Sequence, residues 1–147
     1  MNNINLTEDR IKEGLGEKIF EWKQHSPRRV YFSTKKEDIR QTVKFLFKEL
    51  GLRFITASGT DTPAGLEILY HFSLDRTGVI YSVRVLIEDK KSPTIDSIAP
   101  LFAGAEWIER EIWELLGVNF SGHPNLTHLL LIDDWPQGKY PLRHDHE

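Results

Sequence analysis

A run of glutamates close to residue 110 is the first place in this sequence where acid–base chemistry could be expected. The carboxyl groups belong to Glu106, Glu109, Glu111 and Glu114. Two carboxyl groups at a suitable distance can act as general acid and general base. On a helix, however, these groups point to different sides, and Arg110 has the spacing that favours ion pairs with Glu106 and Glu114. We therefore expect a charged, solvent-facing helix surface here rather than an active site.

Histidines gather toward the end of the chain and could bind a metal ion. They are His123, His128, His144 and His146. A zinc site needs three or four converging ligands at typical spacings, whereas His123 and His128 are five residues apart with Pro124 between them. The terminal pair could chelate a metal only weakly, as short histidine-rich tails do. We expect no metal site in this chain.

Composition excludes several further classes of function. The chain has no cysteine, which removes disulfides, iron–sulfur ligation and thiolate chemistry together. No Gly-x-Ser-x-Gly elbow marks a serine nucleophile. The net charge of -3 gives no electrostatic argument for nucleic acid or for an anionic membrane surface. Because the N-terminus lacks a secretory signal and no apolar run approaches the roughly 20 residues of a membrane span, we expect a cytoplasmic protein without membrane insertion.

The elements that must position these residues begin with an alternation of helices and strands. Hydrophobic spacing predicts a helix over residues 7–24, a strand over 28–33, a helix over 34–50 and a strand over 52–57. Thr34 and Glu37 have the spacing of a capping box, and Gly51 lies where a left-handed C-terminal cap is expected. Residues 58–65 are typical of a turn-rich loop.

A β-hairpin gives the strongest strand signal of the chain. Apolar residues alternate over 66–72 and again over 79–87, and residues 75–78 supply the turn. A helix is then expected from about Ser97 to Leu116, with Pro100 in its first turn and Gly117 as its stop. Its exposed face would carry Trp107, Arg110, Glu111 and Glu114.

Together these elements predict an α+β fold with two layers. We expect a mixed sheet of about four to five strands with helices on one face and an extended C-terminal arm. Length favours one domain, which we divide into an α/β core over residues 1–117 and a docking arm over residues 118–147. The arm is apolar, although its prolines prevent regular structure. Extended segments of this kind bind another surface through backbone hydrogen bonds and side-chain pockets.

The same region carries a specific series of residues. In chain order they are Trp107, Glu109-Arg110-Glu111, Glu114-Leu115-Leu116, Gly117, Phe120, Gly122-His123-Pro124, Asp134-Trp135, Pro141-Leu142-Arg143 and Asp145. With them, residues 99–145 resemble the C-terminal signature of the 30 kDa subunit family of respiratory complex I, which comprises the C subunit of NADH:quinone oxidoreductase. Related subunits occur in energy-converting membrane hydrogenases.

The resemblance implies a subunit without a cofactor or an active site of its own. Iron–sulfur clusters, and FMN or a NiFe centre, would lie on other subunits of an ion-translocating electron-transfer complex. The chain would pack on the large catalytic subunit (that of complex I, or its hydrogenase counterpart) and on iron–sulfur subunits, at the cytoplasmic side of the cell membrane. The implied interface residues are Trp107, Glu109, Arg110, Glu111, Glu114, His123, Pro124, Trp135, Pro141, Leu142 and Arg143.

Three alternatives to the respiratory interpretation stay open at this point. The first is the corresponding subunit of a ferredoxin-linked energy-converting NiFe hydrogenase. The second is a standalone small enzyme that uses the glutamates and histidines of residues 106–128, which would require a concave pocket holding several of them. The third is a docking module without any connection to redox chemistry.

Overall fold

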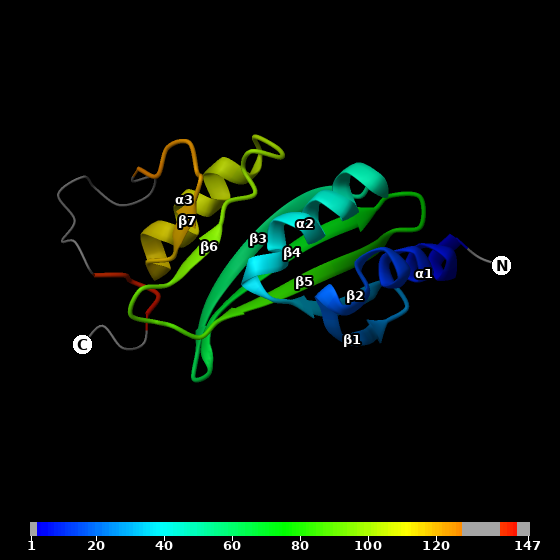
Figure 1. Cartoon of the computed structure of the whole chain (residues 1–147), viewed down its shortest axis with the longest axis horizontal. Helices are drawn as coiled ribbons and strands as arrows, with labels where there is room; N and C mark the ends of the chain where they lie inside the picture. The colour runs from blue at the N-terminus through cyan, green and yellow to red at the C-terminus, as the bar shows by residue number, and fades with distance from the viewer. Residues whose placement is uncertain (1–2, 128–138, 144–147) are drawn as a thin grey trace. The chain divides into compact units, whose positions relative to one another are not determined.

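The structure is a computed structural model of the chain and describes residues 3–127 and 139–143. The helices and strands are, in chain order, α1 (Asn3–Leu15), the 3-10 turn η1 (Gly16–Lys18), β1 (Ile19–Ser26), β2 (Arg29–Thr34), the 3-10 turn η2 (Lys36–Asp38), α2 (Ile39–Lys44), the π-helical turn η3 (Phe45–Glu49), β3 (Arg53–Thr62), β4 (Gly65–Leu74), β5 (Val79–Ile87), β6 (Thr94–Asp96), α3 (Ala105–Leu116) and β7 (Asn119–Ser121) (Figure 1). The described helices are all too short or too polar to cross a lipid bilayer.

The main sheet has five strands in the order β1-β2-β5-β4-β3. β1 pairs with β2 in antiparallel orientation, whereas β2 pairs with β5 in parallel, with Val30 beside Tyr81 and Phe32 beside Val83. A second sheet joins β6 and β7 in parallel. The prediction of an α+β fold with a mixed sheet is therefore confirmed, as are the strand at 28–33 and the hairpin.

The chain divides into two compact units, which we describe separately. The first comprises residues 1–56 and 69–85, and the second comprises residues 57–68 and 86–147. The predicted division into a core over 1–117 and an arm over 118–147 stays a prediction, although Asn119–Ser121 form a strand rather than an irregular start of the arm.

The core of the first unit lies between its helices and one face of its strands. Its buried side chains include Ile11, Leu15, Val30, Phe32, Ile39, Val43, Leu46, Tyr81 and Val83. Gly14 of α1 stands where any side chain would collide with the ring of Phe45. A glycine inside a helix costs about 1 kcal/mol relative to alanine, and here its small size allows η3 to pack closely on α1.

The core of the second unit is built from α3, the two short strands and the end of the hairpin that β3 and β4 form. Its buried side chains include Leu66, Ile68, Ile95, Ile98, Ala105, Ile112, Leu116, Val118 and Phe120. An added Cβ at Gly59 would lie 2.5 Å from Leu116 Cδ1 and 3.3 Å from Ile112 Cγ2. The absence of a side chain at Gly59 thus lets α3 lie directly against β3.

The predicted first helix is wrong in its second half. The apolar spacing of Ile11 and Leu15 continues to Ile19 and Trp22, which suggested one helix to residue 24. In the structure α1 ends at Leu15, and Gly16 adopts a left-handed φ of 53°. This conformation, which glycine adopts without steric cost, redirects the chain so that residues 19–26 form the edge strand β1.

Two other boundaries also differ from the sequence prediction. Residues 58–65 are mostly strand, because β3 runs to Thr62 and β4 starts at Gly65. Thr34 does not cap a helix; its hydroxyl donates to the Lys18 carbonyl at 2.7 Å, and the helical region begins only at Lys36. Gly51 does adopt the expected left-handed conformation, with a φ of 70°.

Candidate docking site on helix α3

Helix α3 begins eight residues later than the sequence indicated, at Ala105 instead of Ser97. Residues 98–101 form a turn instead, and this turn and the preceding Ser97 bind the carboxylate of Glu109. Ser97 Oγ donates to Glu109 at 2.5 Å, and the Ile98 backbone N–H donates at 2.9 Å. The N–H groups of a turn can point at a side chain in this way, whereas the expected helix would have directed them along its own axis.

Glu109 is therefore a structural residue of this unit, and it is fully buried. Burial raises the pKa of Glu109 above its usual value, and the donated bonds from Ser97 and Ile98 and the nearby His123 ring oppose this shift. Glu114 is buried as well. The expectation that Glu109 and Glu114 face solvent is wrong, because α3 packs on neighbours over more of its circumference than its charge pattern suggests.

His123 joins the segment after β7 to α3 through both of its ring nitrogens. Nε2 lies 2.9 Å from the Glu106 carbonyl, and Nδ1 accepts from the Asn125 backbone N–H at 2.9 Å. Because Nδ1 accepts, Nε2 must carry the proton and donate. The ring is 1% exposed and lies 4.0 Å from the Glu109 carboxylate. Neither nitrogen has a lone pair left for a metal ion.

The described residues contain no group of three or more histidine, aspartate or glutamate side chains that could hold a metal ion. His128, His144 and His146 lie outside the described residues, as does the predicted interface residue Trp135. Their roles stay predictions.

The C-terminal end of α3 is closed by residues 140–143. Gly117 ends the helix with a left-handed φ of 80°, as predicted. The Leu142 N–H donates to the Leu115 carbonyl at 3.0 Å. The Arg143 guanidinium donates to the Leu116 carbonyl at 2.9 Å and to the Lys90 carbonyl at 2.6 Å. The last carbonyls of a helix lack partners within it and carry partial negative charge, so a buried arginine is well suited to this position.

Close packing reinforces this closure. The Tyr140 ring lies so near Gly117 that an added Cβ there would stand 2.6 Å from the ring. Arg143 is 8% exposed, and its guanidinium lies 6.0 Å from the centre of the Tyr140 ring. Lys90, whose carbonyl binds Arg143, forms an ion pair of 2.6 Å with the buried Asp61. Residues 140–143 are thus anchored at both α3 and the segment after β5.

The exposed part of the site consists of other signature residues. Trp107 is 62% exposed, and the Arg110 guanidinium lies 5.5 Å from the centre of its ring. Arg110 Nε also donates to the Thr127 carbonyl at 3.0 Å, which fixes the guanidinium beside the indole. Leu142 is 49% exposed. Tryptophan and arginine are among the residue types that dominate binding energy at protein interfaces.

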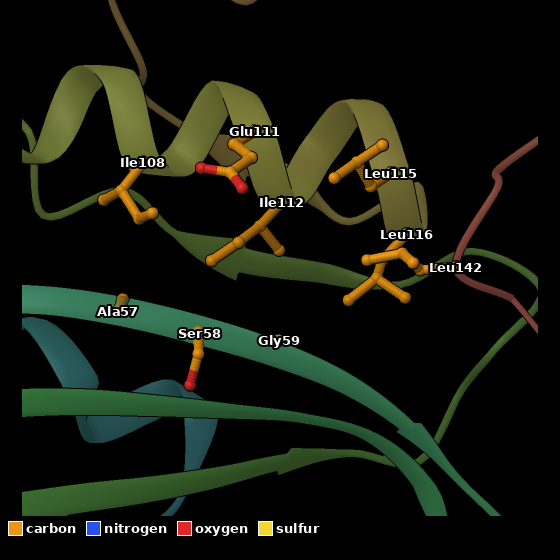
Figure 2. A pocket seen from close by; sticks show the side chains of 9 residues that line it. All are labelled: Ala57, Ser58, Gly59, Ile108, Glu111, Ile112, Leu115, Leu116 and Leu142. Carbon is orange, nitrogen blue, oxygen red and sulfur yellow. The ribbon is translucent and has the colours of Figure 1, made fainter. Parts of the chain in front are cut away.

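A shallow apolar pocket of about 150 Å³ lies between α3 and β3 (Figure 2). Its lining consists of Ala57, Ser58, Gly59, Ile108, Glu111, Ile112, Leu115, Leu116 and Leu142. Figure 2 shows Ile108, Ile112 and Leu116 pointing from the helix toward the strand. Of the glutamates and histidines that the structure describes between residues 106 and 127, Glu111 alone lines this pocket. The arrangement suits the binding of an apolar side chain better than acid–base catalysis.

The structure thus separates the predicted interface residues into two groups. Glu109, Glu114, His123 and Arg143 have buried side chains that hold this unit together. Trp107, Arg110, Glu111, Pro124, Pro141 and Leu142 are exposed or half-buried. Ser97 and Lys90, which bind the first group, were missed because nothing in the local sequence marks them. Contact of any of these residues with a partner stays a prediction.

The sequence model of the family described as "Respiratory-chain NADH dehydrogenase, 30 Kd subunit" matches residues 32–147. The chain belongs to this family. The 30 kDa subunit signature found in residues 99–145 is thereby confirmed.

Curated relatives of this 30 kDa subunit family member come from several complexes. It is 32% identical to the C subunit of NADH-quinone oxidoreductase from Chloroherpeton thalassium over 142 residues, which cover 93% of this chain and 58% of that protein. It is 33% identical to the C subunit of F(420)H(2) dehydrogenase from Methanosarcina mazei over 125 residues, which cover 83% of this chain and 78% of that protein. A third relative, the combined C/D subunit of NADH-quinone oxidoreductase from Bacteroides thetaiotaomicron, is 31% identical over 106 residues, which cover 70% of this chain and 20% of that protein.

A solved structure has the same fold. A chain of the membrane-bound sulfane sulfur reductase, an archaeal respiratory membrane complex, superposes with a TM-score of 0.85 and 24% identity over 99% of this chain and 86% of that one. The chain spans little more than half of the Chloroherpeton relative. Its relatives are subunits of NADH-quinone oxidoreductase and of related complexes.

Proposed function

We propose that this chain is a peripheral subunit of an NADH:quinone oxidoreductase-type complex that docks on the large catalytic subunit through the exposed face of α3. The observation that carries the proposal is the family match over residues 32–147. The Bacteroides relative is named as a combined C/D subunit, and this chain covers 20% of its length. It supports the large subunit, the D part, as the neighbour, because two parts joined in one polypeptide are held close by the covalent link.

The surface of α3 supports the same partner. Trp107, Arg110 and Leu142 combine an aromatic anchor, a fixed cation and an exposed aliphatic side chain, and the pocket beside them is mostly apolar. Interfaces of stable complexes have such apolar centres with aromatic and arginine residues. The buried group of signature residues would then hold this surface rigid before the partner arrives, which reduces the entropy lost on binding.

In this proposal the chain does no chemistry and binds no cofactor. Iron–sulfur clusters, with FMN or a NiFe centre, would be held by other subunits, and the complex would lie at the cytoplasmic side of the cell membrane. The counterpart in a ferredoxin-linked hydrogenase is the second candidate. Its support is the likeness to the C subunit of F(420)H(2) dehydrogenase, which shows that the family is not confined to NADH-dependent complexes.

The docking proposal is tested by co-expressing the chain with the other subunits of its complex. Trp107→Ala combined with Arg110→Ala should weaken co-purification of the large subunit at least about tenfold, as loss of two central interface residues does. The matched control is Ile55→Ala with Lys48→Ala, which removes an exposed apolar residue and an exposed cation from the first unit. Both variants should unfold thermally like the wild type. Equal recovery of the large subunit with the α3 variant would refute the docking face.

A further inference from the structure

The sheet in the first unit has a second face, opposite to the one that packs on its helices. Phe32 marks the covered face, because Trp22 stacks on it with ring centres 5.2 Å apart and the Trp22 Nε1–H donates to Glu8 of α1 at 3.0 Å. Side chains alternate along a strand, so Arg29 and Tyr31 of β2 lie on the opposite face. The parallel register places Tyr31 beside Ser82 and Ser33 beside Arg84 of β5.

A broad basin of about 600 Å³ lies at the β1 edge of the sheet, where Trp22 lines it from the covered face and Tyr31 and Arg84 line it from the opposite face. The lining residues are Glu21, Trp22, Lys23, His25, Tyr31 and Arg84. The rings of His25 and Tyr31 meet edge to face, with centres 5.8 Å apart. Two aromatic side chains, an arginine and a lysine therefore line one concave surface, and these include the residue types enriched at protein interfaces.

Beyond the basin, the positive charge on this face comes from Arg29 and not from His71. Arg29 lies on the same face of β2 and is exposed. Farther across, His71 of β4 bonds through Nδ1 to Ser82 Oγ at 2.7 Å. Burial lowers the pKa of His71, and the positive charge of Arg29 lowers it further. Lys23, His25, Arg29, Tyr31 and Arg84 are called the basic sheet face below.

The backbone of β1 contributes to this arrangement. Glu21 adopts a left-handed φ of 55° at the register shift between Phe20 and Lys23. Such bulges redirect the side chains that follow them. The Glu21 carboxylate lies 3.5 Å from the Ser33 hydroxyl and is the acidic member of the basin lining.

We propose that the basic sheet face binds an acidic segment of a partner protein, with carboxylates at the exposed Lys23 and Arg29 and an apolar side chain against Tyr31. Lys23 and Arg29 are exposed cations on a chain whose net charge is -3, and local positive charges of this kind steer an acidic partner into place. A nucleic acid is disfavoured because the chain as a whole would repel its phosphates and because Glu21 stands inside the basin. This surface is independent of the α3 docking face.

The test uses the full chain and a fluorescein-labelled peptide of glutamate and aspartate residues with a central phenylalanine. Fluorescence anisotropy should show binding that weakens steeply with salt. Lys23→Glu with Arg29→Glu should weaken it at least about tenfold, and Tyr31→Ala should weaken it at unchanged net charge. Lys44→Glu with Lys48→Glu, which makes the same charge change on the α2–η3 segment, should alter affinity less than about twofold.

Several results would overturn this proposal. They are the absence of peptide binding at low salt, an equal loss in the Lys44/Lys48 control, and displacement of the peptide by inorganic phosphate or a single-stranded oligonucleotide at equivalent charge concentration. Thermal unfolding of each variant establishes that it is folded. If the glutamate variant does not fold, Lys23→Gln with Arg29→Gln takes its place, and unchanged binding then refutes the proposal. The Trp107→Ala variant should bind the peptide like the wild type. A failure of the α3 docking proposal can therefore be distinguished from a failure of this one.

Discussion

Arg143 offers the sharpest test of how the signature residues work. The structure gives this side chain an internal role, since its guanidinium donates to the Leu116 and Lys90 carbonyls and is almost fully buried. The resemblance to the family, in contrast, implies a contact with a partner. Replacing Arg143 with alanine distinguishes the two, because an internal bond is lost in the isolated chain and a partner contact is not.

The expected cost follows from the bonds that are removed. A hydrogen bond to a charged group contributes about 1.5–3 kcal/mol, and a cation at the end of a helix contributes about 0.3–1 kcal/mol. With both bonds taken at the lower end of this range, because they share one guanidinium, Arg143→Ala should lower the free energy of unfolding by about 3–4 kcal/mol, which for a chain of this size shifts Tm on the order of 10 °C. Arg143→Lys keeps the charge but not the planar fork of donors, so about half the loss is expected.

Thermal unfolding followed by circular dichroism gives Tm, and amide hydrogen exchange reports on the last turn of α3. Both should change in Arg143→Ala, and neither should change in Lys91→Ala, a control that removes an exposed cation close to the same loop. The reasoning fails if Arg143→Ala unfolds within about 1 °C of the wild type. In that case, loss of the large subunit in co-purification would assign the residue to the interface instead.

Two further predictions concern the same unit. Burial raises the pKa of Glu109, so its contribution to stability is fully present below the unfolded-state pKa of about 4.5 and is lost as pH rises through the higher folded-state pKa. In urea unfolding at a series of pH values, the Glu109→Gln variant should therefore become more stable relative to the wild type as pH rises. A stability difference that does not change with pH would contradict the raised pKa. Gly117→Ala should lower the free energy of unfolding by about 1–3 kcal/mol because of the positive φ at Gly117 and the nearby Tyr140 ring. The control Gly104→Ala should be neutral or stabilising, because nothing lies within 4 Å of an added Cβ there. Equal Tm values for the two variants would argue against the closure of α3 by residues 140–143.

The sequence predicted the hairpin well because its signal is local. Every second residue of 66–72 and of 79–87 is apolar and buried, so period and packing agree. The first helix failed for the opposite reason. Ile19 and Trp22 continue a helical spacing by chance, and a single left-handed glycine, Gly16, outweighs it.

The candidate site was predictable in position but not in the role of its residues. Helical spacing places charged residues outward, yet Glu109 is buried because a turn formed by Ser97 and Ile98 supplies donors to it. Arg143 is similar, since its acceptors include the Lys90 carbonyl, far away in the sequence. Such pairings depend on tertiary contacts between distant segments, which periodicity and motif spacing do not encode.

The irregular outer strand has a consequence for the free protein. β1 is an edge of the five-stranded sheet, and its pairing shifts at Phe20/Lys23 and again at Gln24/Ser26. A straight edge would present an unbroken row of backbone donors and acceptors to any other extended chain, which leads to aggregation. The two shifts interrupt this row of backbone donors and acceptors. Strand-to-strand pairing of free subunits through β1 is thereby disfavoured.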